Sequence, residues 1–164
     1  MAEKTGNKIN LKIVTPYQNF FEGDISSIII PTTDGDIGFM AGHVPMVVAL
    51  KPGVATLRID DEVKHFTVSE GFAEVSGPSM IVVCNSAEYP EEIKLTRMCR
   101  SYLESVDNLE KARSIPDQDA RKLAIKEFEQ EIGRFKARRH LIELYGTQDK
   151  KERLVARLDE YNIK

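Results

Sequence analysis

The chain has 164 residues, of which 41% are apolar and 30% are charged, with a formal net charge of −3. This composition is ordinary for a soluble globular protein and gives no sign of nucleic-acid binding. No run approaches about 18 uninterrupted apolar residues, and residues 1–8 resemble neither a signal peptide nor a transit peptide, so we expect membrane association only through partners. Cys84 and Cys99 lack the spacing of a zinc or redox motif and are expected to be buried free thiols.

The net charge hides a difference between two halves of the chain. Residues 1–90 hold six Lys/Arg against eleven Asp/Glu, a difference of −5, whereas residues 91–164 hold seventeen against fifteen, a difference of +2. The spacing of apolar residues changes at about the same place. We therefore expect two domains, residues 1–88 and residues 89–164.

The first half carries the pattern of β-strands. Short apolar runs, separated by turn residues, occur at 9–13, 28–30, 54–59, 63–68 and 80–83. Asp60, Asp61 and Glu62 separate two of these runs and Gly77 with Pro78 precedes another, as in tight hairpins. The pattern predicts an antiparallel β-sandwich, and nothing in it alternates with helices as a parallel α/β sheet would.

The segment 31–53 is rich in turn residues around Gly42, His43, Val44 and Pro45. Its glycines allow positive φ and its prolines fix φ, so we expect rigid linked turns between strands. Such turns present side chains to partners, which favours recognition over catalysis.

The second half carries a helical pattern from about Glu91. Apolar residues from Leu95 to Leu109 follow the spacing of one helix, and Pro116 interrupts them. Asp117 or Asp119 can cap a second helix, which we expect to end at Gly146. A short third amphipathic piece is expected from Asp149 to Tyr161. The fold class is thus α+β, with a sandwich followed by a helical hairpin and a short helical tail.

Hydrolytic, metal and nucleotide-hydrolysing sites have no support in the sequence. His43, His65 and His140 are scattered and no nucleophile elbow occurs, so no catalytic residues are assigned. Asp34 and Asp36 lack the later ligands of a calcium loop, and no phosphate-binding GxxxxGK[ST] is present. We expect no enzyme activity, no metal and no cofactor.

The order and spacing of several short motifs resemble one family. These are Leu11–Pro16, Phe21–Gly23, Gly35–Gly38, Gly42–Pro45, Leu50–Gly53, Gly71–Val75 and the pieces from Ala87 to Ile93. The chain resembles the epsilon subunit of bacterial F-type ATP synthases, whose mitochondrial counterpart is called delta. The resemblance implies a non-catalytic rotor subunit of the central stalk, peripheral on the cytoplasmic face of the bacterial plasma membrane.

The resemblance also implies partners for the first domain, namely the gamma subunit and the membrane c-ring. By position, Asp36, His43 and Pro45 would face the c-ring, with Asp36 meeting a basic loop residue. The alternative is that residues 42–45 simply form a turn.

For the second domain the resemblance implies regulation, because the family's hairpin can extend into the alpha/beta catalytic head and obstruct ATP hydrolysis. Arg134, Lys136, Arg138 and Arg139 match in region the basic residues that make this inhibitory contact. A solvated charged face is the alternative.

Some family members bind ATP through an Ile/Leu-Asp-X-X-Arg-Ala motif at the start of the first helix. Here Ile93 and Arg97 remain, but the Asp is Lys94 and the Ala is Met98. We expect weak or absent ATP binding. An unrelated adaptor, a sandwich with a partner-binding hairpin, is the alternative function, and it would not bind a gamma subunit.

Overall fold

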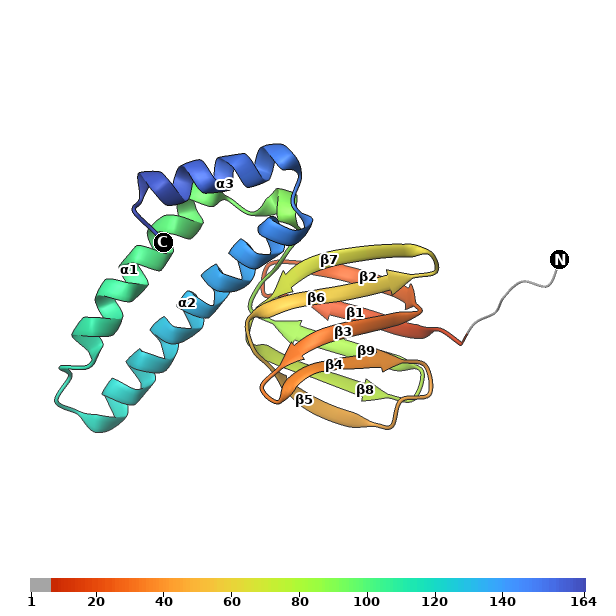
Figure 1. The fold of residues 1–164 in the computed structure, drawn as a ribbon. Helices are drawn as coiled ribbons and strands as arrows, with labels where there is room; N and C mark the ends of the chain where they lie inside the picture. Colours follow the sequence, from red (N-terminus) through yellow and green to blue (C-terminus); the bar gives the residue numbers. More distant parts are fainter. Residues whose placement is uncertain (1–6) are drawn as a thin grey trace. The chain divides into compact units, whose positions relative to one another are not determined.

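The computed structural model describes residues 7–164, which divide after Glu88 into two compact units. The first unit holds ten strands and the second holds one short 3₁₀ helix, η1, and three α-helices (Figure 1). The strands are β1 (Ile9–Val14), β2 (Asn19–Ile25), β3 (Ser27–Thr32), β4 (Gly35–Met40), β5 (Met46–Leu50), β6 (Gly53–Ile59), β7 (Glu62–Val68), β8 (Gly71–Ser76), β9 (Ser79–Cys84) and β10 (Ala87–Glu88).

The first unit is a two-layered sandwich made from one continuous sheet that folds back on itself. The strand order is β10-β7-β6-β3-β5-β8-β9-β1-β2, and β4 pairs with β3 off this path. A single residue pair, Thr32 with Leu50, joins β3 to β5, and this weak link is where the two layers separate. Every ladder is antiparallel except that of β1 with β9, which is parallel. The predicted sandwich is therefore confirmed, with one parallel pair that the sequence did not reveal.

Alternation of apolar residues builds the core between the layers. Ile9, Leu11 and Ile13 of β1 are all 0% exposed, as are Ile28 and Ile30 of β3, while the residues between them face outward. Phe20 of β2 and Phe66 of β7 meet across the layers with ring centroids 5.0 Å apart. The period of two along each strand thus assigns one face to the core.

The expectation of linked turns throughout residues 31–53 is wrong. Two strands, β4 and β5, occupy most of this segment, and Pro31 and Thr32 end β3. Glycines with positive φ lie at the ends of β4, at Gly35 (φ 113°) and Gly42 (φ 82°). The connections between strands in this segment are therefore confined to residues 33–34, 41–45 and 51–52.

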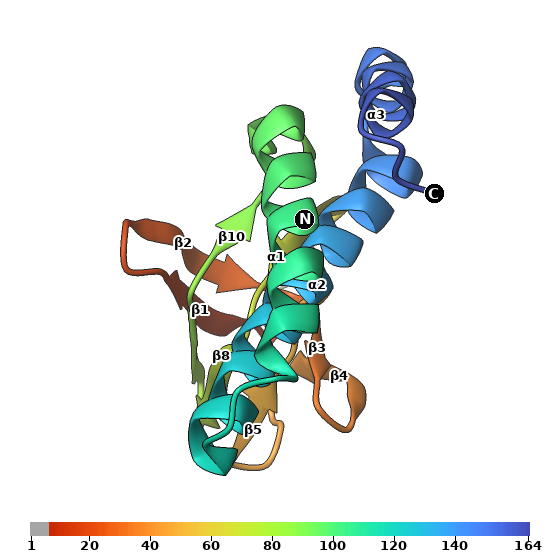
Figure 2. The same cartoon turned by 90° about the vertical axis from the view of Figure 1, so that its left-hand side faces the viewer.

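The second unit begins with η1 (Pro90–Glu92) and then forms α1 (Leu95–Ala112) and α2 (Gln118–Tyr145) as a hairpin. Asp117 caps α2, since its side chain accepts a hydrogen bond of 2.7 Å from the amide of Ala120. Gly146 ends α2, as predicted. The third helix, α3 (Gln148–Glu160), follows after Thr147, whose side chain caps it. Figures 1 and 2 show α1 and α2 side by side and α3 running across the end of the hairpin where α1 begins and α2 ends.

Candidate partner-binding surfaces

Strand β4 presents three alternate positions to solvent. Asp36, Gly38 and Met40 are exposed, whereas Phe39 between them is buried at 1%. Among the described residues β4 pairs only with β3, so its other edge is unpaired. Asp36 is thus a freely presented carboxylate on a rigid edge strand.

The loop that follows β4 holds His43 by local contacts. The imidazole packs on Phe39 with ring centroids 4.7 Å apart, and Nδ1 lies 2.8 Å from the carbonyl oxygen of Val44. The ring is only half-buried, and Pro45 beside it is exposed. His43 therefore stabilises the loop and is also partly exposed. Its geometry is compatible with a structural role in the turn and with contact to a partner.

The three residues proposed to contact the c-ring do not cluster at one place. Asp36 lies near the start of β4 and His43 and Pro45 lie beyond its end. Four residues of extended strand place Asp36 about 13 Å from Met40. The candidate surface is therefore a strip along β4 and its loop.

Sequence reasoning missed the apolar members of this strip. Met40 is 61% exposed and Val44 is 69% exposed, although apolar side chains of this size are usually buried. Along a strand every second residue faces outward and is usually polar. An apolar residue at such a position was the signal that could have identified Met40.

A second exposed apolar surface lies on the outer face of the layer that contains β5, β8, β9 and β1. Strand registers place Ala49 beside Phe72, Phe72 beside Val83, and Val83 beside Val14. Phe72 is 44% exposed and Val47 on the same face is 64% exposed. We name Val14, Val47, Ala49, Phe72, Ile81 and Val83 the apolar sheet face. Contiguous exposed apolar area of this kind marks interaction sites.

The basic cluster of α2 is largely paired within the hairpin. Arg134 Nη1 lies 2.7 Å from Glu131 Oε2, and Arg138 Nη1 lies 3.7 Å from Glu131 Oε1. Arg139 Nε donates to Glu143 at 2.7 Å. Lys136 alone of the four proposed residues is classed as exposed. Glu131 also accepts a 2.9 Å bond from Ser101 of α1, so it joins the two helices.

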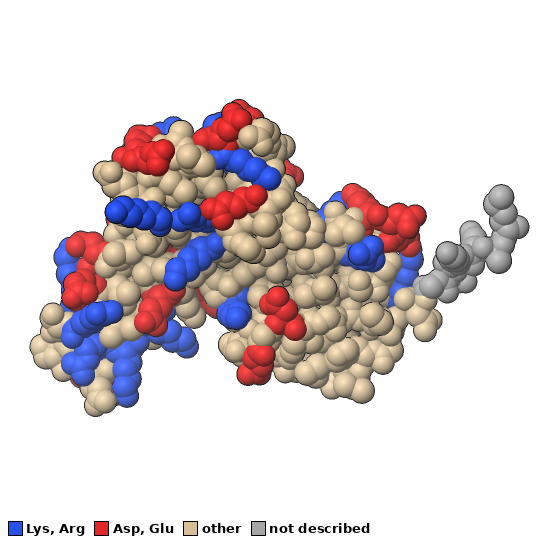
Figure 3. Space-filling model, in the orientation of Figure 1, with Lys and Arg blue, Asp and Glu red and all other residues tan. Residues whose placement is uncertain are grey.

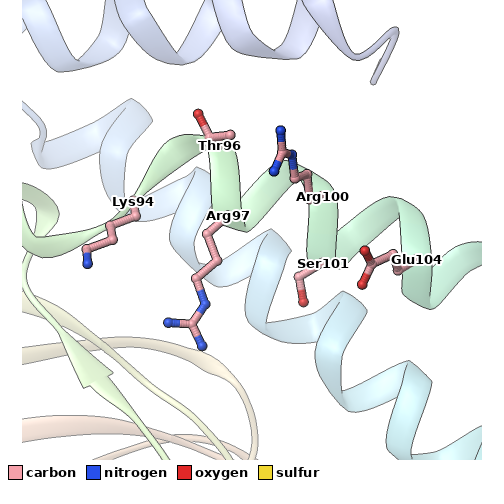
Figure 4. A pocket seen from close by; sticks show the side chains of 6 residues that line it. All are labelled: Lys94, Thr96, Arg97, Arg100, Ser101 and Glu104. Atoms are coloured by element: carbon pink, nitrogen blue, oxygen red, sulfur yellow. The ribbon is translucent and has the colours of Figure 1, made fainter.

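Of the two residues considered for nucleotide binding, Arg97 lines a hollow of about 500 Å³ on α1 and Ile93 does not. The hollow is formed by Lys94, Thr96, Arg97, Arg100, Ser101 and Glu104. Figure 4 shows Lys94 and Arg97 on one side of α1 and Arg100 pointing to the other side. Ile93 is 2% exposed and its carbonyl accepts a 2.6 Å bond from Lys150 of α3. Met98 is 3% exposed and belongs to the hairpin interior. The three cations therefore do not converge on one anion.

The remaining candidate residues are the two cysteines and His65, none of which forms a site. Both cysteines are free and buried, as predicted. His65 is half-buried in β7, with Nδ1 3.1 Å from Thr56 Oγ1, and burial lowers its pKa. Within residues 7–164 no group of three metal-binding side chains gathers, and no helix in that range is long and apolar enough to cross a membrane.

Comparison with known proteins gives consistent matches. Residues 8–90 match the family model described as ATP synthase, Delta/Epsilon chain, beta-sandwich domain. The ATP synthase epsilon chain of Alkaliphilus metalliredigens is 32% identical over 127 residues, which cover 77% of this chain and 95% of that protein. The epsilon chain of Prochlorococcus marinus strain MIT 9515 is 41% identical over 85 residues, which cover 52% of this chain and 63% of that protein.

Solved structures show the same fold at lower identity. A chain of the Euglena gracilis mitochondrial ATP synthase (OSCP/F1/c-ring) aligns with a TM-score of 0.62 and 22% identity, covering 80% of this chain and 79% of that one. A chain of the Tetrahymena thermophila mitochondrial ATP synthase central stalk/c-ring aligns with a TM-score of 0.55 and 21% identity, covering 79% and 94%.

Rigid sheet surfaces with exposed apolar and acidic groups, together with a charged helical hairpin, define a protein-binding subunit. The matches specify which kind. The chain belongs to the ATP synthase delta/epsilon chain family. Epsilon chains are accessory subunits of ATP synthase, whose catalysis resides on other subunits.

Proposed function

We propose that this chain is a rotor subunit that joins the gamma subunit of an F-type ATP synthase to the c-ring, on the cytoplasmic side of a bacterial membrane. The observation that carries the proposal is that the sandwich has two separate exposed surfaces suited to protein partners. One is the strip along β4, with Asp36 and Met40, and the other is the apolar sheet face. A subunit that couples two partners needs two such surfaces.

We assign the apolar sheet face to gamma and the β4 strip to the c-ring. The apolar sheet face is mostly apolar, with Glu74 between Val47 and Ile81 as a charged member, and such area suits a contact that remains buried. An acidic group on an edge strand instead provides orientation toward a basic loop. Chains of the same fold occur in ATP synthase assemblies described as OSCP/F1/c-ring and as central stalk/c-ring, which supports partners of this kind.

Exchange of Asp36 for Lys tests the c-ring assignment. Asp36→Lys should leave unfolding unchanged, because the carboxylate is exposed, but should weaken retention of the chain by membranes that carry the c-ring. Asp61→Lys, an equally exposed change in the β6–β7 turn, is the control. Equal retention of both variants would remove Asp36 from the contact.

We further propose that the helical unit inhibits ATP hydrolysis when the basic cluster reaches the alpha/beta catalytic head. In the closed hairpin Arg134 and Arg138 pair with Glu131, and Arg139 pairs with Glu143. Engagement of an acidic loop on the head would exchange these internal pairs for external ones. The basic residues would then have acidic partners in both states, so the electrostatic free energy would differ little between them. A switch between two packings requires such a small difference.

The test is ATP hydrolysis by the reconstituted catalytic head with the full chain and with a chain that ends at Glu88. The shorter chain retains all ten strands and should still bind gamma. Inhibition by the full chain alone would support both binding and regulation. Gamma binding without inhibition by either form would leave only the coupling role, and absence of gamma binding by both forms would contradict the coupling role.

A further inference from the structure

The last helix of the chain packs on both arms of the hairpin. Leu154 is 1% exposed and Leu158 is 7% exposed, whereas Val155 between them is 57% exposed. Helix α3 contacts both α1 and α2, and Ile163 beyond its end is also buried. One face of α3 therefore packs against the hairpin.

Polar contacts tie this segment to the α1 arm. Lys150 Nζ donates to the carbonyl oxygen of Ile93 at 2.6 Å, just before α1 begins. At the other end of α3, Arg100 Nε of α1 donates to Tyr161 Oη at 3.1 Å. Cys99 lies between these points and is 0% exposed. Burial raises the pKa of its thiol, and the nearby charges of Arg157 and Glu160 on α3 act on it in opposite directions.

A second set of contacts ties the segment to the α2 arm. Arg139 Nη1 donates to the carbonyl oxygen of Lys164 at 3.2 Å. The joint itself is tight, since a Cβ at Gly146 would lie 2.6 Å from the carbonyl oxygen of Ile142. Glycine is therefore the residue that fits between α2 and α3, and the bond from Arg139 holds the end of the chain to α2.

We propose that residues 147–164 form a strap that holds α1 and α2 together and also retains Arg139 of the basic cluster through its bond to the carbonyl oxygen of Lys164. Separation of the two helices requires that the buried side of α3 leave at least one arm, with loss of Leu154 and Leu158 burial. The Alkaliphilus epsilon chain is matched over 95% of its length by only 77% of this chain, so this chain carries residues that the relative lacks.

Amide hydrogen exchange of the full-length chain tests the strap directly. Leu154→Asp places a charge on the buried face of α3, and Val155→Asp places the same charge on its exposed face. In Leu154→Asp the amides in the first turns of α1 and the last turns of α2 should exchange at least about tenfold faster. In Val155→Asp they should stay within about twofold of the native chain. Protection retained by the amides in the middle turns of α1 and α2 shows that the helical unit of each variant remains folded. Loss of protection throughout both helices would mean that the unit has unfolded, and Tyr161→Phe then decides the question.

Tyr161→Phe gives a milder second variant, because it removes only the hydroxyl that Arg100 contacts. It should raise exchange at the start of α1 while α2 is little affected. If Leu154→Asp raises the exchange rates of amides within α3 alone, α3 does not stabilise the hairpin and the strap is refuted.

The consequence for inhibition rests on the proposed function and has its own readout. With the catalytic head, Leu154→Asp should inhibit ATP hydrolysis at lower concentration than the native chain does. If α1 exchanges faster but inhibition is unchanged, the strap stands and the inhibitory proposal fails.

Discussion

Gly71 of β8 lies directly against the backbone of β9. It pairs with Cys84 of β9, and a Cβ added there would lie 1.9 Å from the carbonyl oxygen of Val83. The obstacle is backbone, so no side-chain rotation can relieve the overlap. Gly71 is therefore required by close packing, not by a turn.

Gly71→Ala should lower the free energy of unfolding of the sandwich by at least about 2 kcal/mol. Gly38→Ala is the control, because the nearest atom to its added Cβ is Ile29 Cγ1 at 3.8 Å. That change should stay within about 0.5 kcal/mol of the native chain. Chemical denaturation of both variants decides the matter, and equal stability would contradict the close approach.

Cys84 makes the stability of the sandwich depend on pH in the alkaline range. Burial raises the pKa of its thiol to about 11, against an ordinary value of 9.0, although hydrogen bonds with the backbone of Ser69 and Ser86 act in the opposite direction. The folded chain therefore holds this proton more tightly than the unfolded chain. Its contribution to stability is complete below about pH 9 and is lost as the pH rises toward 11.

Between pH 8 and pH 10.5 the native chain should lose about 2 kcal/mol more stability than Cys84→Ala, which has no thiol to ionise. Other groups titrate equally in both proteins, so the difference isolates Cys84. Denaturant unfolding at the two pH values measures it, and parallel losses would show that the thiol ionises normally.

At the scale of elements, β4 was the main error of the sequence analysis. Glycines at 35, 38 and 42 suggested turns, but only Gly35 and Gly42 have positive φ, and Gly38 lies within the strand. Composition cannot distinguish a glycine that turns the chain from one on the open face of a strand. Pairing with β3, which the sequence does not display, decided the structure.

The hairpin was easier to predict, because helix caps and apolar spacing are local. Asp117, Gly146 and the third helix appear where the pattern placed them. The pairing of the basic cluster was missed, although Glu131 lies three residues before Arg134, a spacing visible in the sequence.

The start of α1 should bind ATP weakly or not at all. Lys94 and Arg97 point away from Arg100, and the carbonyl of Ile93 already accepts a bond from Lys150. Titration calorimetry on the isolated full chain should give a dissociation constant weaker than micromolar. A micromolar or tighter constant would overturn this prediction. Lys94→Asp, which restores the acidic residue of the family motif, is the informative comparison.

At the scale of the molecule, charge is distributed unequally between the two units. Figure 3 shows Lys, Arg, Asp and Glu dense over the helical unit and sparse over the visible face of the sandwich. On this face the sandwich carries few charged side chains, whereas the helices carry many ion pairs that can be exchanged. This division agrees with a permanent coupling role for the first unit and a reversible one for the second.

The parallel pairing of β1 with β9 has a consequence for biosynthesis. Asn10 pairs with Ser79, so the first strand must wait for a partner about seventy residues later in the chain. Non-local pairing of this kind slows folding, whereas helices form from neighbours. During translation the sandwich therefore cannot close until β9 has emerged from the ribosome, and until then the edge of β1 that β9 covers is unpaired, as in strands that are prone to aggregation.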